Sequence, residues 1–163
     1  MSGEILSEEA YRKLVARCSA RELCESEVRD KLRNWSVSRV DEDRIVEQLY
    51  NERYIDENRY AQAFTNDKFR FDGWGRIKIG YTLRQKAIDA LTVSQALQAI
   101  DEIEYRDALL RILKSKMRSL KAMPQEMQRE KLMRFAMLRG FEPNLICESL
   151  KELSLECEIG SEI

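Results

Sequence analysis

Apolar and polar residues follow one another along this chain with the period of an α-helix, and no stretch alternates with the two-residue period of a strand. A clear example is the set Leu110, Leu113, Met117 and Leu120, whose three- and four-residue steps place them on one helix face. The pattern is interrupted near residues 20–25, 35–40, 55, 72–75, 88–92, 101, 121–124 and 140–143. It predicts an all-α fold of about nine helices, each of roughly 10 to 16 residues.

Two registers predict three copies of one three-helix unit. Tyr11, Tyr60 and Tyr105 lie in the first helix of each group, 49 and 45 residues apart. We therefore expect repeats at residues 1–55, 56–101 and 102–154, an acidic tail at 155–163, and an elongated, curved helical stack. The second register consists of spans of 17 residues, each with an apolar residue five positions into it: Leu32 to Leu49 with Val37, Leu83 to Ile100 with Ile88, and Ala136 to Leu153 with Phe141.

Residues near several breaks are suited to helix N-termini. Ser7 and Ser26 precede charged helical stretches, and Asp41 precedes another, so we expect these side chains to cap helices. Pro124 and Pro143 lie where a proline in the first turn is tolerated.

The composition narrows the range of functions. The chain has 163 residues, of which 44% are hydrophobic and 35% are charged, enough apolar material for a core. It contains no histidine, which excludes histidine-dependent nucleophilic catalysis and histidine-containing zinc sites. The four cysteines form no CxxC pair, and we interpret them as reduced thiols. We therefore expect no catalytic residues, no metal and no cofactor.

Charge is unevenly distributed along the chain. The formal net charge is −1, but residues 66–139 hold 16 basic and 9 acidic residues, a balance of +7 between acidic ends. This stretch favours a polyanion or an acidic protein surface as partner; the alternative is a solvated face whose long side chains shield a helix edge. The candidate partner- or DNA-binding residues are Lys68, Arg70, Arg76, Lys78, Arg84, Lys86, Arg111, Lys114, Arg118 and Lys121.

The aromatic residues of the second repeat divide between core and surface. Tyr60, Phe64 and Phe71 are four and seven residues apart, so we expect them to share a buried face. Phe69 lies between two basic residues; core packing is favoured, and an exposed aromatic within a charged patch is the alternative. Trp74 lies between two glycines, which favours a turn with a packed ring over a partner contact.

The least generic segment covers residues 55–88. Its ordered residues are Ile55, Asp56, Glu57, Arg59, Tyr60, Ala61, Phe64, Asp67, Lys68, Arg70, Trp74, Gly75, Lys78, Ile79, Leu83, Lys86 and Ile88. This segment resembles the RecX family, regulators of the recombinase RecA, and the remaining repeats are consistent with the resemblance. Family members look like three tandem three-helix repeats. One departure is Ala87, where the family often has glycine, and this departure calls the left-handed end of that helix into question.

The resemblance implies a non-enzymatic regulator that lies in the helical groove of the RecA filament on single-stranded DNA. Binding there would hinder strand exchange and ATP turnover and would limit filament growth or promote disassembly, which moderates the SOS response. The alternative is a helical-repeat DNA-binding protein that acts without a filament partner. The sequence pI near 5.8 and the lack of a base-reading Asn, Gln and Arg cluster at a helix start count against this alternative.

The sequence also bears on location. No run approaches the roughly 18 to 20 apolar residues of a membrane span, and the first residues lack the basic and apolar regions of a signal peptide. We expect a cytoplasmic protein without membrane contact, and a monomer.

Overall fold

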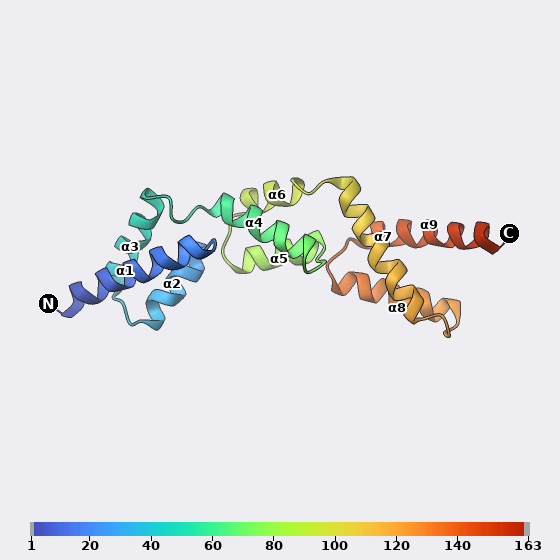
Figure 1. The fold of residues 1–163 in the computed structure, drawn as a ribbon, viewed down its shortest axis with the longest axis horizontal. Helices are drawn as coiled ribbons and strands as arrows, with labels where there is room; N and C mark the ends of the chain where they lie inside the picture. Colours follow the sequence, from blue (N-terminus) through green and yellow to red (C-terminus); the bar gives the residue numbers. More distant parts are fainter. Residues whose placement is uncertain (1, 162–163) are drawn as a thin grey trace. The chain divides into compact units, whose positions relative to one another are not determined.

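The computed structural model describes the backbone of residues 2–161 and the side chains of residues 6–154. Over this part of the chain the fold is all-α, which confirms the predicted fold class. The breaks between helices coincide with the interruptions in the sequence pattern. The helices are α1 (Ser2–Ala20), α2 (Glu25–Asn34), α3 (Arg39–Asn51), α4 (Glu57–Arg70), α5 (Arg76–Gln85), α6 (Ala90–Gln98), α7 (Glu102–Ser119), α8 (Gln125–Leu138) and α9 (Pro143–Ser161) (Figure 1).

The threefold helical repeat is present in the order of these helices. The tyrosines that defined it lie in α1, α4 and α7, the first helix of each group of three. The boundaries expected at residues 55, 101 and 154 stay predictions, as does the elongated, curved stack. The tail expected at 155–163 lies outside the residues whose side chains are described.

The chain forms two compact units. Unit 1 comprises Met1–Phe64 and Thr82–Ala96, and unit 2 comprises Thr65–Tyr81 and Leu97–Ile163. Their boundaries lie within α4, α5 and α6, so the middle three helices contribute to both units.

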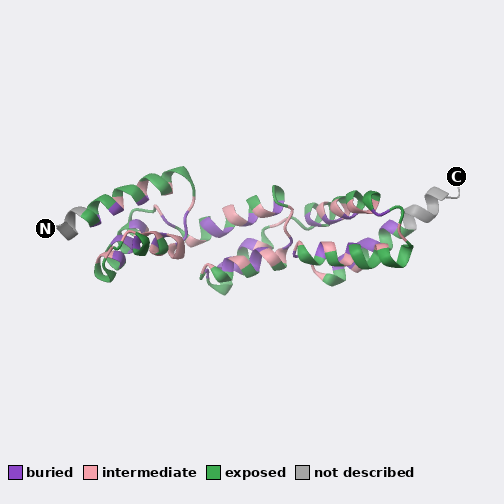
Figure 2. Cartoon of the chain, turned by 90° about the horizontal axis from the view of Figure 1, so that it is seen from below, coloured by how far each residue is buried: buried purple, intermediate pink, exposed green. Residues whose placement is uncertain are grey.

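Each unit has a core of buried apolar residues. Figure 2 marks the buried residues along the helices in purple. In unit 1, Leu14, Leu32 and Leu49 are fully buried members of one cluster. In unit 2, the buried Tyr105 ring lies 5.1 Å from the Phe141 ring, measured between centroids. Burial of such stripes drives the packing of helices that would be marginal alone.

Several helices end with a residue in the left-handed conformation. After α2, α5 and α8 the φ angles of Ser36, Ala87 and Gly140 are 58°, 62° and 94°. These ends are Schellman motifs, in which an N–H bonds to a carbonyl five residues earlier. Ala87 therefore retains the left-handed end without glycine. The bonds join Val37 to Leu32 (3.0 Å), Ile88 to Leu83 (3.2 Å) and Phe141 to Ala136 (3.2 Å), the same pairs that defined the sequence register.

Most of the N-terminal caps expected from the sequence are wrong. Ser7 lies inside α1 and is buried, because that helix begins earlier, and Ser26 lies inside α2, whose N-cap is Cys24. α3 is capped by Ser38, which accepts a hydrogen bond from the N–H of Asp41 at 3.2 Å. Pro124 occupies the N-cap position of α8 instead of the first turn, whereas Pro143 does begin α9.

The expected buried face of α4 is wrong at one position. Tyr60 is buried, but Phe71 is 82% exposed, because α4 ends at Arg70 and the helical period does not continue beyond it. Phe69 is buried and stacks on Tyr105 at 5.7 Å between ring centroids. Core packing is thus confirmed for Phe69.

Candidate functional site

The loop between α4 and α5 packs closely against the turn between α8 and α9 in unit 2. The N–H of Gly75 donates to the carbonyl oxygen of Arg139 at 2.7 Å, and the N–H of Ile77 donates to that of Gly140 at 2.9 Å. A Cβ atom on Gly75 would lie 2.4 Å from the carbonyl carbon of Gly140, so only glycine permits this approach. Backbone contacts of this kind fix the position of the loop.

Trp74 lies in this loop between two lysines. Its ring is half-buried, and its backbone N–H donates to the carbonyl oxygen of Lys68 at 2.9 Å. The Lys68 and Lys78 ammonium groups lie 4.8 and 4.2 Å from the centre of the ring. Lys68 also pairs with Asp72 at 2.8 Å. The indole therefore holds two cations close together.

A polar cluster beneath the loop involves Arg76. Its guanidinium lies 3.9 Å from the Tyr105 ring centre and bonds to Glu142 at 3.1 Å and to Glu102. The Tyr105 hydroxyl donates to Glu142 and accepts from the Arg76 N–H at 3.0 Å. Burial and the bond to Glu142 raise the pKa of Tyr105, which keeps the hydroxyl protonated. The Arg76 side chain is only 20% exposed and its charge is balanced within the fold.

A basic cavity of about 470 Å³ lies between α7 and α8, and we call it the α7–α8 groove. Lys116 Nζ lies 5.2 Å and Arg139 Cζ 5.0 Å from the centre of the Phe135 ring. Arg139 also donates to the carbonyl oxygen of Asp72 at 3.2 Å, beside the Trp74 loop. The groove has no acidic lining residue; it is lined by Arg111, Ile112, Ser115, Lys116, Ser119, Phe135 and Arg139.

The predicted cations of unit 2 have different surroundings. Arg111, Lys114 and Arg118 are exposed along α7, and Lys121 is exposed just after it. Arg70 lies 3.6 Å from Glu104 in an exposed ion pair. The structure thus groups the α7 cations on one helix and Lys68 with Lys78 at the indole ring.

Two predicted cations, Arg84 and Lys86, belong to unit 1. Arg84 is exposed. Lys86 donates to Glu27 at 2.9 Å, and Tyr60 donates to the same carboxylate at 2.9 Å. Lys86 is therefore tied to an internal ion pair.

Sequence reasoning missed three groove residues: Lys116, Phe135 and Arg139. Lys116 lies four residues after Ile112 and so belongs to the same side of α7, a signal that the helical period contained. Phe135 and Arg139 are also four residues apart, on α8. The pairing of these two helix faces is a tertiary feature that the sequence pattern does not specify.

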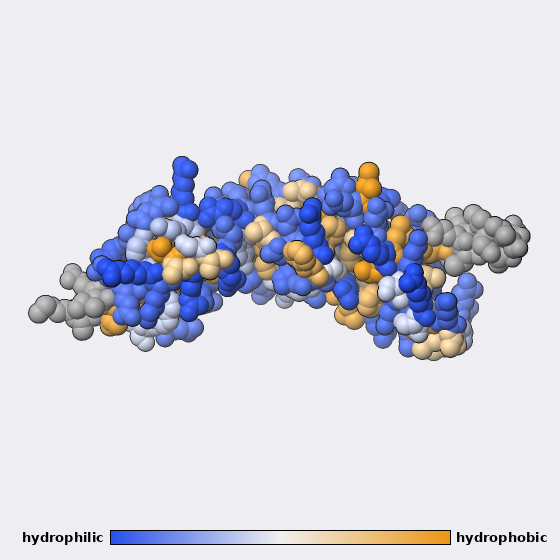
Figure 3. Space-filling view, viewed as in Figure 1, coloured by the Kyte–Doolittle hydropathy of each residue, from blue (hydrophilic) through white to orange (hydrophobic). Residues whose placement is uncertain are grey.

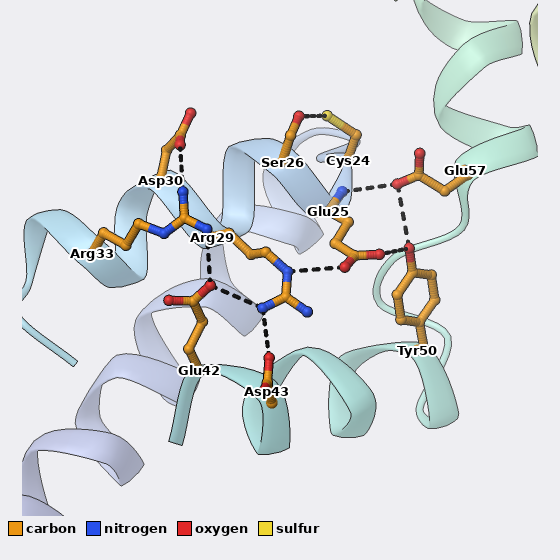
Figure 4. Close-up of polar contacts among 10 residues, drawn as sticks. All are labelled: Cys24, Glu25, Ser26, Arg29, Asp30, Arg33, Glu42, Asp43, Tyr50 and Glu57. Atoms are coloured by element: carbon orange, nitrogen blue, oxygen red, sulfur yellow. Dashed lines mark hydrogen bonds and ion pairs between the residues drawn. The ribbon is translucent and has the colours of Figure 1, made fainter. Parts of the chain in front are cut away.

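A second polar cluster joins α2, α3 and the start of α4 in unit 1 (Figure 4). Arg29 bonds to Glu25 (2.9 Å), to the buried Glu42 (2.9 Å) and to Asp43 (2.8 Å). The Tyr50 hydroxyl donates to Glu25 at 2.7 Å. Because the cation is matched by carboxylates, this cluster serves the packing of helices.

Glu57 also belongs to that cluster, but its pKa is shifted upward. Its carboxylate accepts from the N–H of Glu25 at 2.8 Å and from the Tyr50 hydroxyl at 3.4 Å. Burial and the nearby Glu25 charge nevertheless raise the pKa of Glu57. An adjacent cavity of about 390 Å³ has both acidic and basic lining residues, among them Glu57, Asp89, Arg33 and Lys86.

No described helix is long and apolar enough to cross a membrane. Among the described side chains, no three Cys, Asp or Glu residues are grouped as a metal site would require.

Comparison with known sequences gives a match to one family model over part of the chain. Residues 56–97 match the family model described as RecX, second three-helix domain. The "Regulatory protein RecX" of Clostridium botulinum (strain Eklund 17B / Type B) is 29% identical over 133 residues, which cover 78% of this chain and 60% of that protein. The protein of the same name from Prosthecochloris aestuarii is 28% identical over 144 residues, covering 88% of this chain and 93% of the relative.

Solved structures share the fold. A crystal structure of RecX from Lactobacillus salivarius has a TM-score of 0.83 and 18% identity, covering 93% of this chain and 99% of that one. Another crystal structure of a regulatory protein RecX has a TM-score of 0.80 and 19% identity, covering 88% and 71%. The chain spans about 60% of the length of the Clostridium botulinum relative.

Proposed function

We propose that this chain, which is similar to the regulatory proteins named RecX, binds the RecA filament on single-stranded DNA and lowers the strand-exchange and ATPase activities of the recombinase. It acts as a monomeric, non-enzymatic partner in the cytoplasm and limits the recombination and SOS responses. The observation that carries the proposal is the match of residues 56–97 to the second three-helix domain of RecX.

The basic surface of unit 2 supports the proposal physically. Exposed cations attract both DNA phosphates and acidic protein surfaces. Arg111 and Arg118 are exposed on α7 and have no carboxylate partner among the described side chains. We assign filament contact to these α7 cations and to Lys68 and Lys78 at the indole ring, whereas Arg76 mainly stabilises the fold.

Regulation follows from selective binding. A partner that binds one state of the filament more tightly than another shifts the filament toward that state. A protein that holds neighbouring recombinase subunits in one arrangement therefore slows the cycle of ATP turnover and strand exchange. No chemical step by the bound protein is needed.

The test is ATP hydrolysis by the recombinase of the same organism on single-stranded DNA. We expect turnover to fall when this protein is present at substoichiometric amounts. A variant with Arg111→Glu, Lys114→Glu and Arg118→Glu should remain folded, because exposed charges contribute little to stability, and should inhibit poorly. The matched control carries Arg106→Glu, Arg129→Glu and Lys151→Glu, an equal charge change on other exposed residues of unit 2. Unchanged turnover at equimolar protein would overturn the proposal.

The same assay separates the alternative function. A DNA-binding protein that acts without a filament partner would leave turnover unchanged when DNA is in excess. The basic lining of the α7–α8 groove is the one observation that favours this alternative. If the two charge variants inhibit equally, the α7 cations do not contact the filament.

A further inference from the structure

We infer that the α7–α8 groove binds the phosphate backbone of single-stranded nucleic acid directly, without the recombinase. The inference deepens the proposed function and rests on it for its biological setting, but the chemistry of the groove stands on its own.

The positive charge of the α7–α8 groove is not balanced by nearby acidic residues among those described. Residues 111–121 contain five basic residues and residues 131–139 contain three, and neither stretch contains an acid. The helices that carry them pack against each other. Among the described side chains, Arg111 and Lys116 have no carboxylate partner, whereas in the same unit Arg76 has two and Arg106 has one. The positive potential of the groove is therefore not cancelled locally.

The donors of the groove suit phosphate. Three cationic side chains line it together with the hydroxyl of Ser115, whereas the hydroxyl of Ser119 already donates to the carbonyl oxygen of Lys116 at 2.7 Å. Arg, Lys and Ser side chains are among the groups that donate hydrogen bonds to nucleic-acid phosphates. The volume of about 470 Å³ lies within the range of about 300–1,000 Å³ that is usual for ligand sites. The lining lacks the acceptor-rich mixture seen in the cavity beside Glu57.

Phe135 positions two of the cations. Lys116 and Arg139 both lie about 5 Å from the ring centre, at 5.2 and 5.0 Å. Arg139 is also held by the carbonyl oxygen of Asp72. Charges that are already placed lose less conformational freedom when a ligand binds. The groove is thus more ordered than a set of freely moving surface lysines.

The aromatic ring favours a single strand over a duplex or an acidic polypeptide. Phe135 is half-buried and lines the groove, so a base can take the place of Lys116 or Arg139 beside the ring when that cation pairs with a phosphate. Proteins that bind single strands combine a basic groove along the backbone with aromatic rings on which bases stack. A duplex keeps its bases stacked inside the helix, and an acidic polypeptide has no base to offer.

The test is fluorescence anisotropy with a labelled oligodeoxythymidine and no recombinase. The groove variant carries Arg111→Gln and Lys116→Gln, and the matched control carries Arg106→Gln and Lys151→Gln, which remove the same charge from the same unit. We expect the groove variant to weaken binding at least about tenfold and to reduce the slope of log affinity against log salt by about 1.4, since each contacted phosphate of a single strand contributes about 0.7. The control should weaken binding less than about threefold.

A second variant tests the ring. Phe135→Leu retains an apolar side chain but removes the aromatic face, and we expect a loss of at least about fivefold, because stacking of one base contributes about 1–3 kcal/mol. Circular dichroism of each variant should match that of the parent.

Several results would overturn the inference. These are no binding of the oligonucleotide by the parent, equal losses in the groove and control variants, equal affinity for a duplex of the same length, and displacement of the oligonucleotide by polyglutamate as readily as by unlabelled strand. Because the assay contains no recombinase, it is independent of the ATPase test. Binding through the groove together with unchanged ATP turnover would keep this inference and overturn the proposed function.

Discussion

At the scale of single residues, one hydrogen bond recurs in all three repeats. Tyr11, Tyr60 and Tyr105 each donate to a glutamate: Glu52, Glu27 and Glu142 respectively. The carboxylates that accept from Tyr60 and Tyr105 also bond to a cation, Glu27 to Lys86 and Glu142 to Arg76. A cation and hydrogen bonds of this kind offset the cost of placing a carboxylate near the core.

The sequence predicted the tyrosines but not their partners. The tyrosine spacing follows the repeat, whereas the partner follows Tyr11 and Tyr105 in the chain and precedes Tyr60. No fixed interval therefore identifies the glutamate. For the same reason, the sequence could not show that Arg76 and Lys86 are matched by acids within the fold.

Glu57 gives a pH-dependent prediction. Burial, together with the Glu25 charge, raises its pKa above 4.5, the ordinary value. A raised carboxyl pKa means that folding favours the protonated form, so stability is lost as pH rises from about 4.5 through the raised pKa. Glu57→Gln keeps an acceptor oxygen for the Glu25 N–H and removes the charge. We expect the variant to be more stable than the parent at pH 7, with the difference shrinking toward pH 4.

Glu27→Gln is the matched control for Glu57→Gln. Burial opposes ionisation of Glu27, but hydrogen bonds from Lys86 and Tyr60 outweigh it and lower the pKa of this carboxyl. A lowered pKa contributes stability above the ordinary value that is lost as pH falls. Glu27→Gln should therefore be less stable than the parent at pH 7, the opposite sign. Urea unfolding at several pH values measures both effects, and the same sign in both variants would contradict the assignment.

At the scale of helices, the left-handed ends explain why the sequence register held. The five-residue interval is the interval of the Schellman hydrogen bond, and the apolar pair at its two ends packs together. α3 ends in the same way, with Arg53 at φ 61° and the Tyr54 N–H bonded to the Leu49 carbonyl oxygen at 2.9 Å. N-terminal caps were predicted less well, because Ser7, Ser26 and Asp41 lie inside helices, where the residue type alone does not mark a helix start.

Ala87 and Gly140 occupy equivalent ends with different constraints. Ala87 is exposed, so Ala87→Gly should relieve the left-handed strain and stabilise the protein by about 0.5–1 kcal/mol. A Cβ on Gly140 would lie 2.3 Å from Lys78 Cβ and 2.6 Å from its backbone nitrogen, so Gly140→Ala should destabilise by about 2–4 kcal/mol. Thermal and urea unfolding compare the two. Destabilisation by Ala87→Gly would show that the alanine end is not strained.

At the scale of the whole molecule, the sequence predicted which segment is basic, but not which side chains from different helices lie together. The +7 balance of residues 66–139 identified α7 as basic, and Arg111, Lys114 and Arg118 are exposed on this helix. Phe135 and Arg139 were missed, because their place in the α7–α8 groove depends on the packing of α8 against α7. The repeats predicted from the sequence also gave no sign that α4, α5 and α6 would each be divided between two compact units.

Salt provides the test at this scale. Counterion release and screening both weaken charge-driven association, and the screening length falls from about 10 Å at 0.1 M to about 3 Å at 1 M salt. Binding of the parent to recombinase filaments, measured by co-sedimentation, should weaken steeply between low and high salt. The Arg111→Glu, Lys114→Glu and Arg118→Glu variant should bind poorly at low salt and change little. If binding of the parent does not depend on salt, the interface is formed by an uncharged surface.

The left-handed helix ends also bear on how far the sequence can change while the fold is kept. Serine, arginine, alanine and glycine all occupy that position within this one chain, because backbone hydrogen bonds form the end and the side chain contributes little. The residue at each end can therefore be substituted as long as the interval between its flanking apolar positions is kept. A fold built this way tolerates extensive change of sequence: the Lactobacillus salivarius structure shares it, with a TM-score of 0.83, at 18% identity.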